Sequence, residues 1–105
     1  MKDNEQAARE AILECYGTED GEFGPTLFVT HHLEELNSKD WKDSLGKPSP
    51  DAQDILKSLV LLEAWDSEDD GENDTYDFSL PGQVTDYMLS VRFQNGEIVS
   101  IEMES

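Results

Sequence analysis

The sequence predicts an α+β fold of two layers, in which a mainly antiparallel β-sheet packs against two amphipathic helices. Apolar residues recur at helical spacing near the N-terminus and again after Pro48, whereas they alternate with polar residues near the C-terminus. The strand signals gather in the second half, so the sheet is expected to end in a run of four strands. The length of 105 residues fits one domain, covering residues 1–105.

Two longer helices and one short helix are expected. The first spans residues 3–16 and presents an apolar stripe that Gly17 ends. The second begins at residues 48–51, with Ser49 as N-cap and Pro50 at the first helical position. A short helix lies between them, capped by Asn37 or Ser38 and ended by Gly46. The apolar positions of the three helices are Ala7, Ala8, Ala11, Ile12, Cys15, Trp41, Leu45, Ala52, Ile55, Leu56 and Leu59.

Three strand candidates precede the C-terminal hairpin. Residues 26–32 contain the apolar run 27–29 directly after Pro25, which favours a strand. The continuation 33–36 either extends that strand or begins a helical turn. Strands are also expected at 61–65 and 76–80, on either side of the acidic segment 66–77, and Pro81-Gly82 should form a turn.

The C-terminal hairpin carries the strongest β signal. Tyr87, Leu89, Val91 and Phe93 alternate before Asn95-Gly96, and Val99, Ile101 and Met103 alternate after it. A two-residue turn would pair Val91 with Ser100 and mix the two faces. A three-residue loop with a left-handed Gly96 would pair Val91 with Val99 and keep one apolar face, so this loop is predicted.

The charge excludes several classes of function. Asp and Glu number 25 against 7 Lys and Arg, a formal net charge of −18. That field repels nucleic-acid phosphates and anionic membranes, and instead favours a basic protein as partner. No apolar run could span a bilayer and no secretory leader is visible, so a cytoplasmic protein is expected. A single cysteine, Cys15, excludes an intramolecular disulfide and a Cys-rich zinc site.

The acidic segment suggests a calcium site as an alternative. With Gly71 at the sixth position of a twelve-residue loop, carboxylates occupy positions one, three, five, nine and twelve. These residues are Asp66, Glu68, Asp70, Asp74 and Asp77. The last ligand is an Asp instead of the usual Glu, and the flanks are expected to be strands instead of helices. A solvated hairpin loop explains the same charges, and in that case Asp69, Glu72 and Trp65 are candidates for contact with a partner.

No motif points to an enzyme or to a cofactor. His31 and His32 are expected to point to opposite faces of a strand, so they cannot bind one metal ion together. A small hydrolase that uses one of them is the least favoured function, and a structural role is preferred. Cys15 lies on the apolar stripe of the first helix, where a core role is expected. Trp41 and Trp65 are either partner anchors or core residues, and core packing is preferred.

Three segments carry a resemblance, namely residues 30–36, 83–93 and 101–105. They resemble a family of small acidic bacterial proteins classed as domains of unknown function, some of whose relatives look like immunity proteins of toxin–immunity pairs. The resemblance implies a two-layer α/β domain without an established activity, and it brings no catalytic residues with it. Together with the charge, it predicts a non-enzymatic interaction protein that docks a basic partner.

Overall fold

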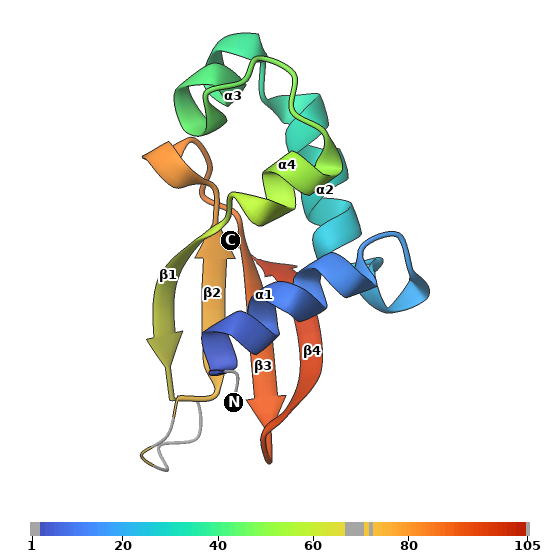
Figure 1. The fold of residues 1–105 in the computed structure, drawn as a ribbon, viewed down its shortest axis with the longest axis vertical. Coiled ribbons are helices and arrows are strands. Elements are labelled where there is room, and N and C mark those ends of the chain that lie inside the picture. The colour runs from blue at the N-terminus through green and yellow to red at the C-terminus, as the bar shows by residue number, and fades with distance from the viewer. Residues whose placement is uncertain (1–2, 67–70, 72, 105) are drawn as a thin grey trace.

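The computed structural model describes residues 3–66, 71 and 73–104. Helices come first and a four-stranded antiparallel sheet follows, so the predicted α+β class is confirmed (Figure 1). The helices are α1 (Asn4–Cys15), α2 (Pro25–Glu35), α3 (Ser38–Leu45) and α4 (Ala52–Lys57). The strands are β1 (Val60–Trp65), β2 (Thr75–Ser79), β3 (Met88–Gln94) and β4 (Glu97–Glu104). Short 3₁₀ turns η1 (Glu19–Gly21) and η2 (Pro81–Gln83) follow α1 and β2 respectively.

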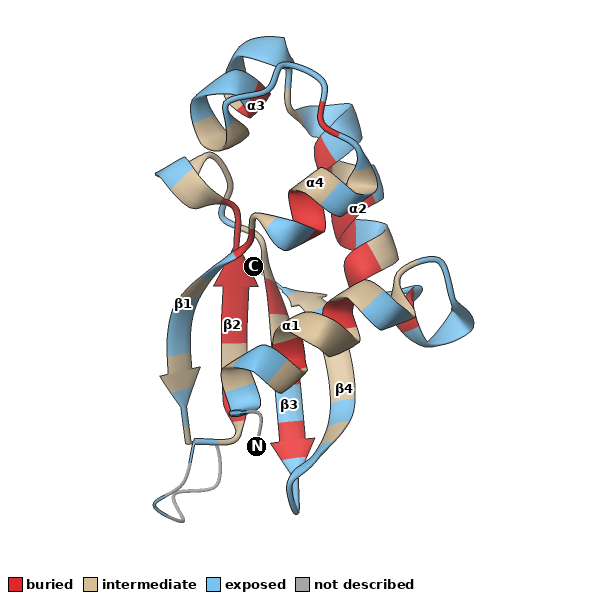
Figure 2. Ribbon diagram, viewed as in Figure 1, coloured by how far each residue is buried: buried red, intermediate tan, exposed pale blue. Residues whose placement is uncertain are grey.

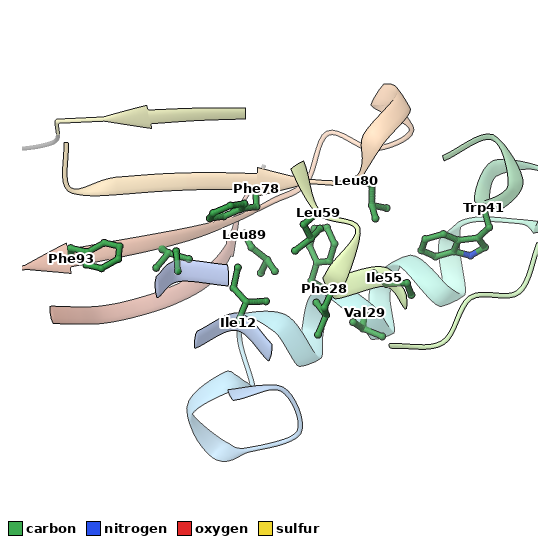
Figure 3. Packing of buried hydrophobic residues seen from close by; sticks show 13 residues of the cluster. Ile12, Phe28, Val29, Trp41, Ile55, Leu59, Phe78, Leu80, Leu89 and Phe93 are labelled. Carbon is green, nitrogen blue, oxygen red and sulfur yellow. The ribbon is translucent and has the colours of Figure 1, made fainter. Parts of the chain in front are cut away.

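The sheet is a simple meander with the order β1-β2-β3-β4. Helix α1 crosses one face of the sheet, while α2 and α4 pack at the end of the sheet where β2 finishes (Figure 1). The core side chains lie on the side of the sheet that faces α1 and α4 (Figure 3). The opposite face, which we call the open face, carries no described helix.

The core joins the helices to the central strands. Thirteen buried apolar residues form one cluster, and its strand members come mainly from β2 and β3 (Figures 2 and 3). Phe28, Phe78 and Leu89 are fully buried, and burial of such side chains stabilises a fold by about 1.5–3 kcal/mol each. The sheet therefore needs only one covered face to be stable, which leaves the other face available.

The predicted strand at residues 26–32 is wrong, because this segment lies within helix α2. Pro25 occupies the first turn of α2, where its missing N–H costs nothing. Phe28, Val29 and His32 are buried, and their spacing places them on one side of a helix. A short apolar run fits either element, and contacts with the sheet and with α4 decide in favour of the helix.

The other helices form where expected. Asp3 caps α1 through Gln6 N, while α3 begins at an Asn37–Asp40 capping box and ends at Gly46, whose φ is 77°. The predicted cap of α4 is wrong by two residues. Asp51 replaces Ser49 as N-cap, because Asp51 and Asp54 each accept the other's backbone N–H.

The C-terminal hairpin has one apolar face, as predicted, but Ile98 takes the place on it that was predicted for Val99. The turn has two residues, with φ of 53° at Asn95 and 79° at Gly96, so the predicted three-residue loop is wrong. A bulge then inserts Val99 into β4, and beyond it Val91 pairs with Ile101. The predicted pairing of Val91 with Val99 is therefore also wrong. Val99 is 54% exposed, because the extra residue of the bulge has no place in the core.

Candidate functional site: the open face of the sheet

Two rows of side chains cross the open face of the sheet. Strand pairing sets both rows, because directly opposed residues project to the same side. The first row, from β1 to β4, is Trp65, Thr75, Arg92 and Ser100. The second row is Glu63, Asp77, Ser90 and Glu102. The open face is thus mostly polar, with a single aromatic ring at its β1 edge.

A hydrogen-bonded cluster connects the two rows. Trp65 Nε1 donates to Asp77 Oδ2 at 3.1 Å, and Ser90 Oγ donates to Asp77 Oδ1 at 2.6 Å. Asp77 is only 8% exposed, whereas Trp65 is 41% exposed. The buried carboxylate therefore fixes the orientation of an indole ring that still presents much of its surface to solvent. Both donors are neutral, so neither compensates the negative charge of an ionised Asp77.

A shallow pocket of about 160 Å³ lies beside the indole ring. The residues that line it are Trp65, Thr75, Ser90, Arg92, Ser100, Glu102 and Glu104. Glu102 and Glu104 bring two carboxylates to the rim, whereas Arg92 is the single basic residue of the lining. Asp77 and Glu63 add two more carboxylates to the second row, so the open face has more acidic than basic residues.

The acidic segment between β1 and β2 is described only in part. Asp66 Oδ2 accepts a hydrogen bond from Gly71 N at 2.7 Å, and Asp74 Oδ1 accepts one from Thr75 Oγ1 at 2.8 Å. Glu68, Asp69, Asp70 and Glu72 lie outside the described residues, so their predicted roles as calcium ligands or partner contacts stay predictions.

Asp77 is the member of the predicted calcium set whose surroundings are clearest. It belongs to strand β2, not to the loop, and its two oxygens accept hydrogen bonds from Trp65 and Ser90. Within residues 3–66, 71 and 73–104, no group of three or more His, Cys, Asp or Glu side chains is placed to hold a metal ion. The calcium set as a whole stays a prediction.

The two histidines belong to α2, so the expectation that they point to opposite faces of a strand is wrong. His32 is buried, with Nδ1 2.7 Å from the Phe28 carbonyl oxygen and Nε2 2.8 Å from Thr85 Oγ1. The carbonyl can only accept, so Nδ1 carries the proton and the neutral Nε2 accepts from Thr85. Burial lowers the pKa of His32 below its ordinary value. His31 packs edge-on against Tyr87, with ring centroids 4.5 Å apart.

His32 therefore ties α2 to the segment between β2 and β3. The hydroxyl of Thr85 also accepts the backbone N–H of Tyr87 at 3.2 Å, so it donates to His32 and accepts from the β2–β3 segment at once. Every polar atom of the imidazole has a partner inside the protein, as expected for a structural residue.

Cys15 and the two tryptophans differ in their surroundings. Cys15 is half-buried at the end of α1, and burial raises the pKa of its thiol, which disfavours the reactive thiolate. Trp41 is 3% exposed and belongs to the core, as preferred from the sequence. Trp65, for which core packing was also preferred, lies outside the core on the open face. Trp65 is the last residue of the edge strand β1, and this position explains its exposure. The residue type alone favours burial and does not indicate this exposure.

None of the helices in the described ranges is both long and apolar enough to cross a membrane. Comparisons with known protein families, with curated proteins and with solved structures found no match.

Proposed function

We propose that this protein is a non-enzymatic interaction module whose acidic exterior docks a basic protein partner, in the way that an immunity protein blocks a toxin. The observation that carries the proposal is the balance of 25 acidic against 7 basic residues. Even if each basic side chain paired with one carboxylate, eighteen carboxylates would have no cation within the chain. A cationic partner supplies the missing charge.

The positions of the acidic residues support the proposal. Fourteen of the acidic residues that the structure describes are exposed, and Asp77 is the one that is buried. The ion pairs Arg9–Glu5 at 3.0 Å and Lys47–Asp54 at 3.1 Å are partly exposed to solvent, where such pairs contribute little to stability. The negative field therefore extends into solvent, where it can steer an approaching cationic surface.

The charge is also unevenly distributed along the chain. Four of the lysines, at positions 39, 42, 47 and 57, fall in the segment of α3 and α4. From residue 58 onward Arg92 is the only basic residue, against twelve acidic ones. The half of the chain that forms the sheet is therefore the part that attracts a basic surface most strongly.

Affinity capture at two ionic strengths tests the proposal. The tagged protein is incubated with an extract of the cells that make it, and bound proteins are recovered at two salt concentrations. The Debye length is about 30 Å at about 0.01 M salt and about 3 Å at about 1 M salt. We expect one specific partner with a net positive charge, whose purified form associates at least about tenfold more slowly at the higher salt.

An unrelated acidic protein of similar size and charge serves as the control, because proteins that it also captures bind any polyanion and are disregarded. A specific partner without net positive charge, or an association rate equal at both salt concentrations, would contradict the proposed function.

A further inference from the structure

Resting on the proposed function, we infer that the basic partner docks on the open face of the sheet and places an arginine or lysine side chain in the pocket beside Trp65. The core and helices cover the other face. The outer edge of β4 is partly occupied, because Met103 N donates to the Phe23 carbonyl oxygen at 2.9 Å and Gly24 packs against the Ile101 carbonyl. The open face is thus the broad surface of the sheet that a partner can reach.

Trp65 has the properties of a binding anchor. Trp65 is 41% exposed, and the hydrogen bond to Asp77 already holds its ring in one orientation. The Trp65 side chain therefore loses little additional conformational entropy when a partner contacts its ring. Trp is also the residue type most enriched among the energetically dominant residues of interfaces, and its face is the best aromatic surface for a cation.

The surroundings of the ring select a cation over an anion or an apolar group. Glu102 and Glu104 stand at the rim of the pocket, and the Asp77 carboxylate accepts the indole N–H of Trp65. A guanidinium or ammonium group placed against the indole can contact the rim carboxylates at the same time. Arg92 offsets one negative charge, and the face still carries more carboxylates than cations.

The edge next to Trp65 adds apolar contact area. Val60 lies opposite Ser79 on the open face, and Leu62 stands at a register shift in β1 and is 53% exposed. Apolar contacts near the centre with charged groups around them are the arrangement of a protein interface. An extended basic segment with an apolar residue three to five positions from its arginine or lysine matches this surface, because Leu62 and Val60 lie that far from Trp65 along β1.

A capped hexa-arginine peptide serves as the probe, titrated into the ¹⁵N-labelled protein at low salt. The chain has two tryptophans, so two indole N–H signals report on two places. The Trp65 signal and the amides of Ser90, Arg92, Ser100 and Glu102 should shift. The Trp41 signal should stay in place, because that ring is buried in the core.

Two charge-matched variants localise the binding. In titrations at about 0.15 M salt, Glu102→Gln/Glu104→Gln should weaken hexa-arginine binding roughly tenfold, because both substitutions remove a carboxylate from the rim of the pocket. Glu14→Gln/Glu34→Gln, with the same change in net charge on helices α1 and α2, should weaken it by only about twofold at a Debye length of about 8 Å.

The outcomes separate this inference from the proposed function. A selective shift of Trp65 with the larger loss in the sheet variant supports docking on the open face. Equal losses in both variants, with shifts spread over the helices, would overturn the open face as the docking surface while leaving a general attraction to basic partners. No binding even at low salt would contradict the proposed function itself.

Discussion

Deletion of Val99 should leave the protein folded with little loss of stability. Val99 is the extra residue of the bulge in β4, where Phe93 pairs with Ile98 and Arg92 with Ser100. Without it the hairpin becomes regular, and every other pairing can stay in place. By contrast, deletion of Glu102 moves the end of β4 by one residue relative to β3, which reverses the faces of its side chains.

The magnitudes follow from burial. Val99 is 54% exposed, so its removal gives up about 1 kcal/mol of apolar burial. Deletion of Glu102 either turns Met103 outward and brings Glu104 opposite Leu89, or turns Ile101 outward and brings Ser100 opposite Val91. Loss of a partly buried apolar side chain together with a polar group at a core position costs about 3 kcal/mol. The change in charge alone would make the Glu102 deletion more stable, because removing one carboxylate reduces the repulsion within an acidic chain.

Urea unfolding measures both deletions. The fluorescence of buried Trp41 and the far-UV circular dichroism follow the transition, and the free energy of unfolding comes from the midpoint at unchanged slope. We expect the Val99 deletion to be at least about 2 kcal/mol more stable than the Glu102 deletion. Equal losses in the two deletions would refute the assignment of the bulge and of the register beyond it.

Three further outcomes are expected. Burial lowers the pKa of His32, so as the pH falls through the ordinary value of 6.5 the unfolded chain binds a proton before the folded protein does. The free energy of unfolding should therefore decrease in this pH range. In urea melts at a series of pH values, His32→Gln should remove this decrease. Because burial raises the pKa of the Cys15 thiol, its alkylation at pH 8 should be slower in the folded protein than in urea, and equal rates would contradict this. Gly24→Ala should destabilise the protein by more than Gly17→Ala does in thermal melts, because its Cβ would overlap the Ile101 carbonyl, whereas Gly17 has open space and only an unfavourable φ of 80°.

Local signals sufficed for several elements of the fold. Asp3, Asn37 and Gly46 mark helix ends by chemistry that acts within a few residues, so the sequence predicts α1 and α3 closely. The strands β1 and β2 begin and end within one residue of the predicted bounds.

Elements decided by distant contacts could not be predicted in the same way. The run Leu27-Phe28-Val29 suits a strand as well as a buried helix, and packing of α2 on the sheet and α4 decides between them. In the hairpin, the alternating apolar residues correctly predict that one face of the two strands is apolar. A longer loop and a bulge both give one apolar face, and the sequence does not distinguish them.

The candidate site shows the same division. Trp65 and Asp77 are both visible in the sequence, but nothing local relates residues twelve positions apart across an acidic segment. Pairing of β1 with β2 brings them into one hydrogen-bonded cluster with Ser90 of β3. The tryptophan that stays exposed, and the carboxylate that fixes its ring, therefore become apparent only once the sheet is assembled.

The central claim is tested most directly by zero-length carbodiimide cross-linking of the protein to its captured basic partner. This reagent joins a lysine amine to a carboxylate only where the two form a contact, and peptide mass spectrometry identifies the acidic residue. We expect lysines of the partner to be joined mainly to Glu102, Glu104 and Glu63 on the open face. Cross-links found instead mainly at Glu14 and Glu34 on the helices would contradict docking on the sheet.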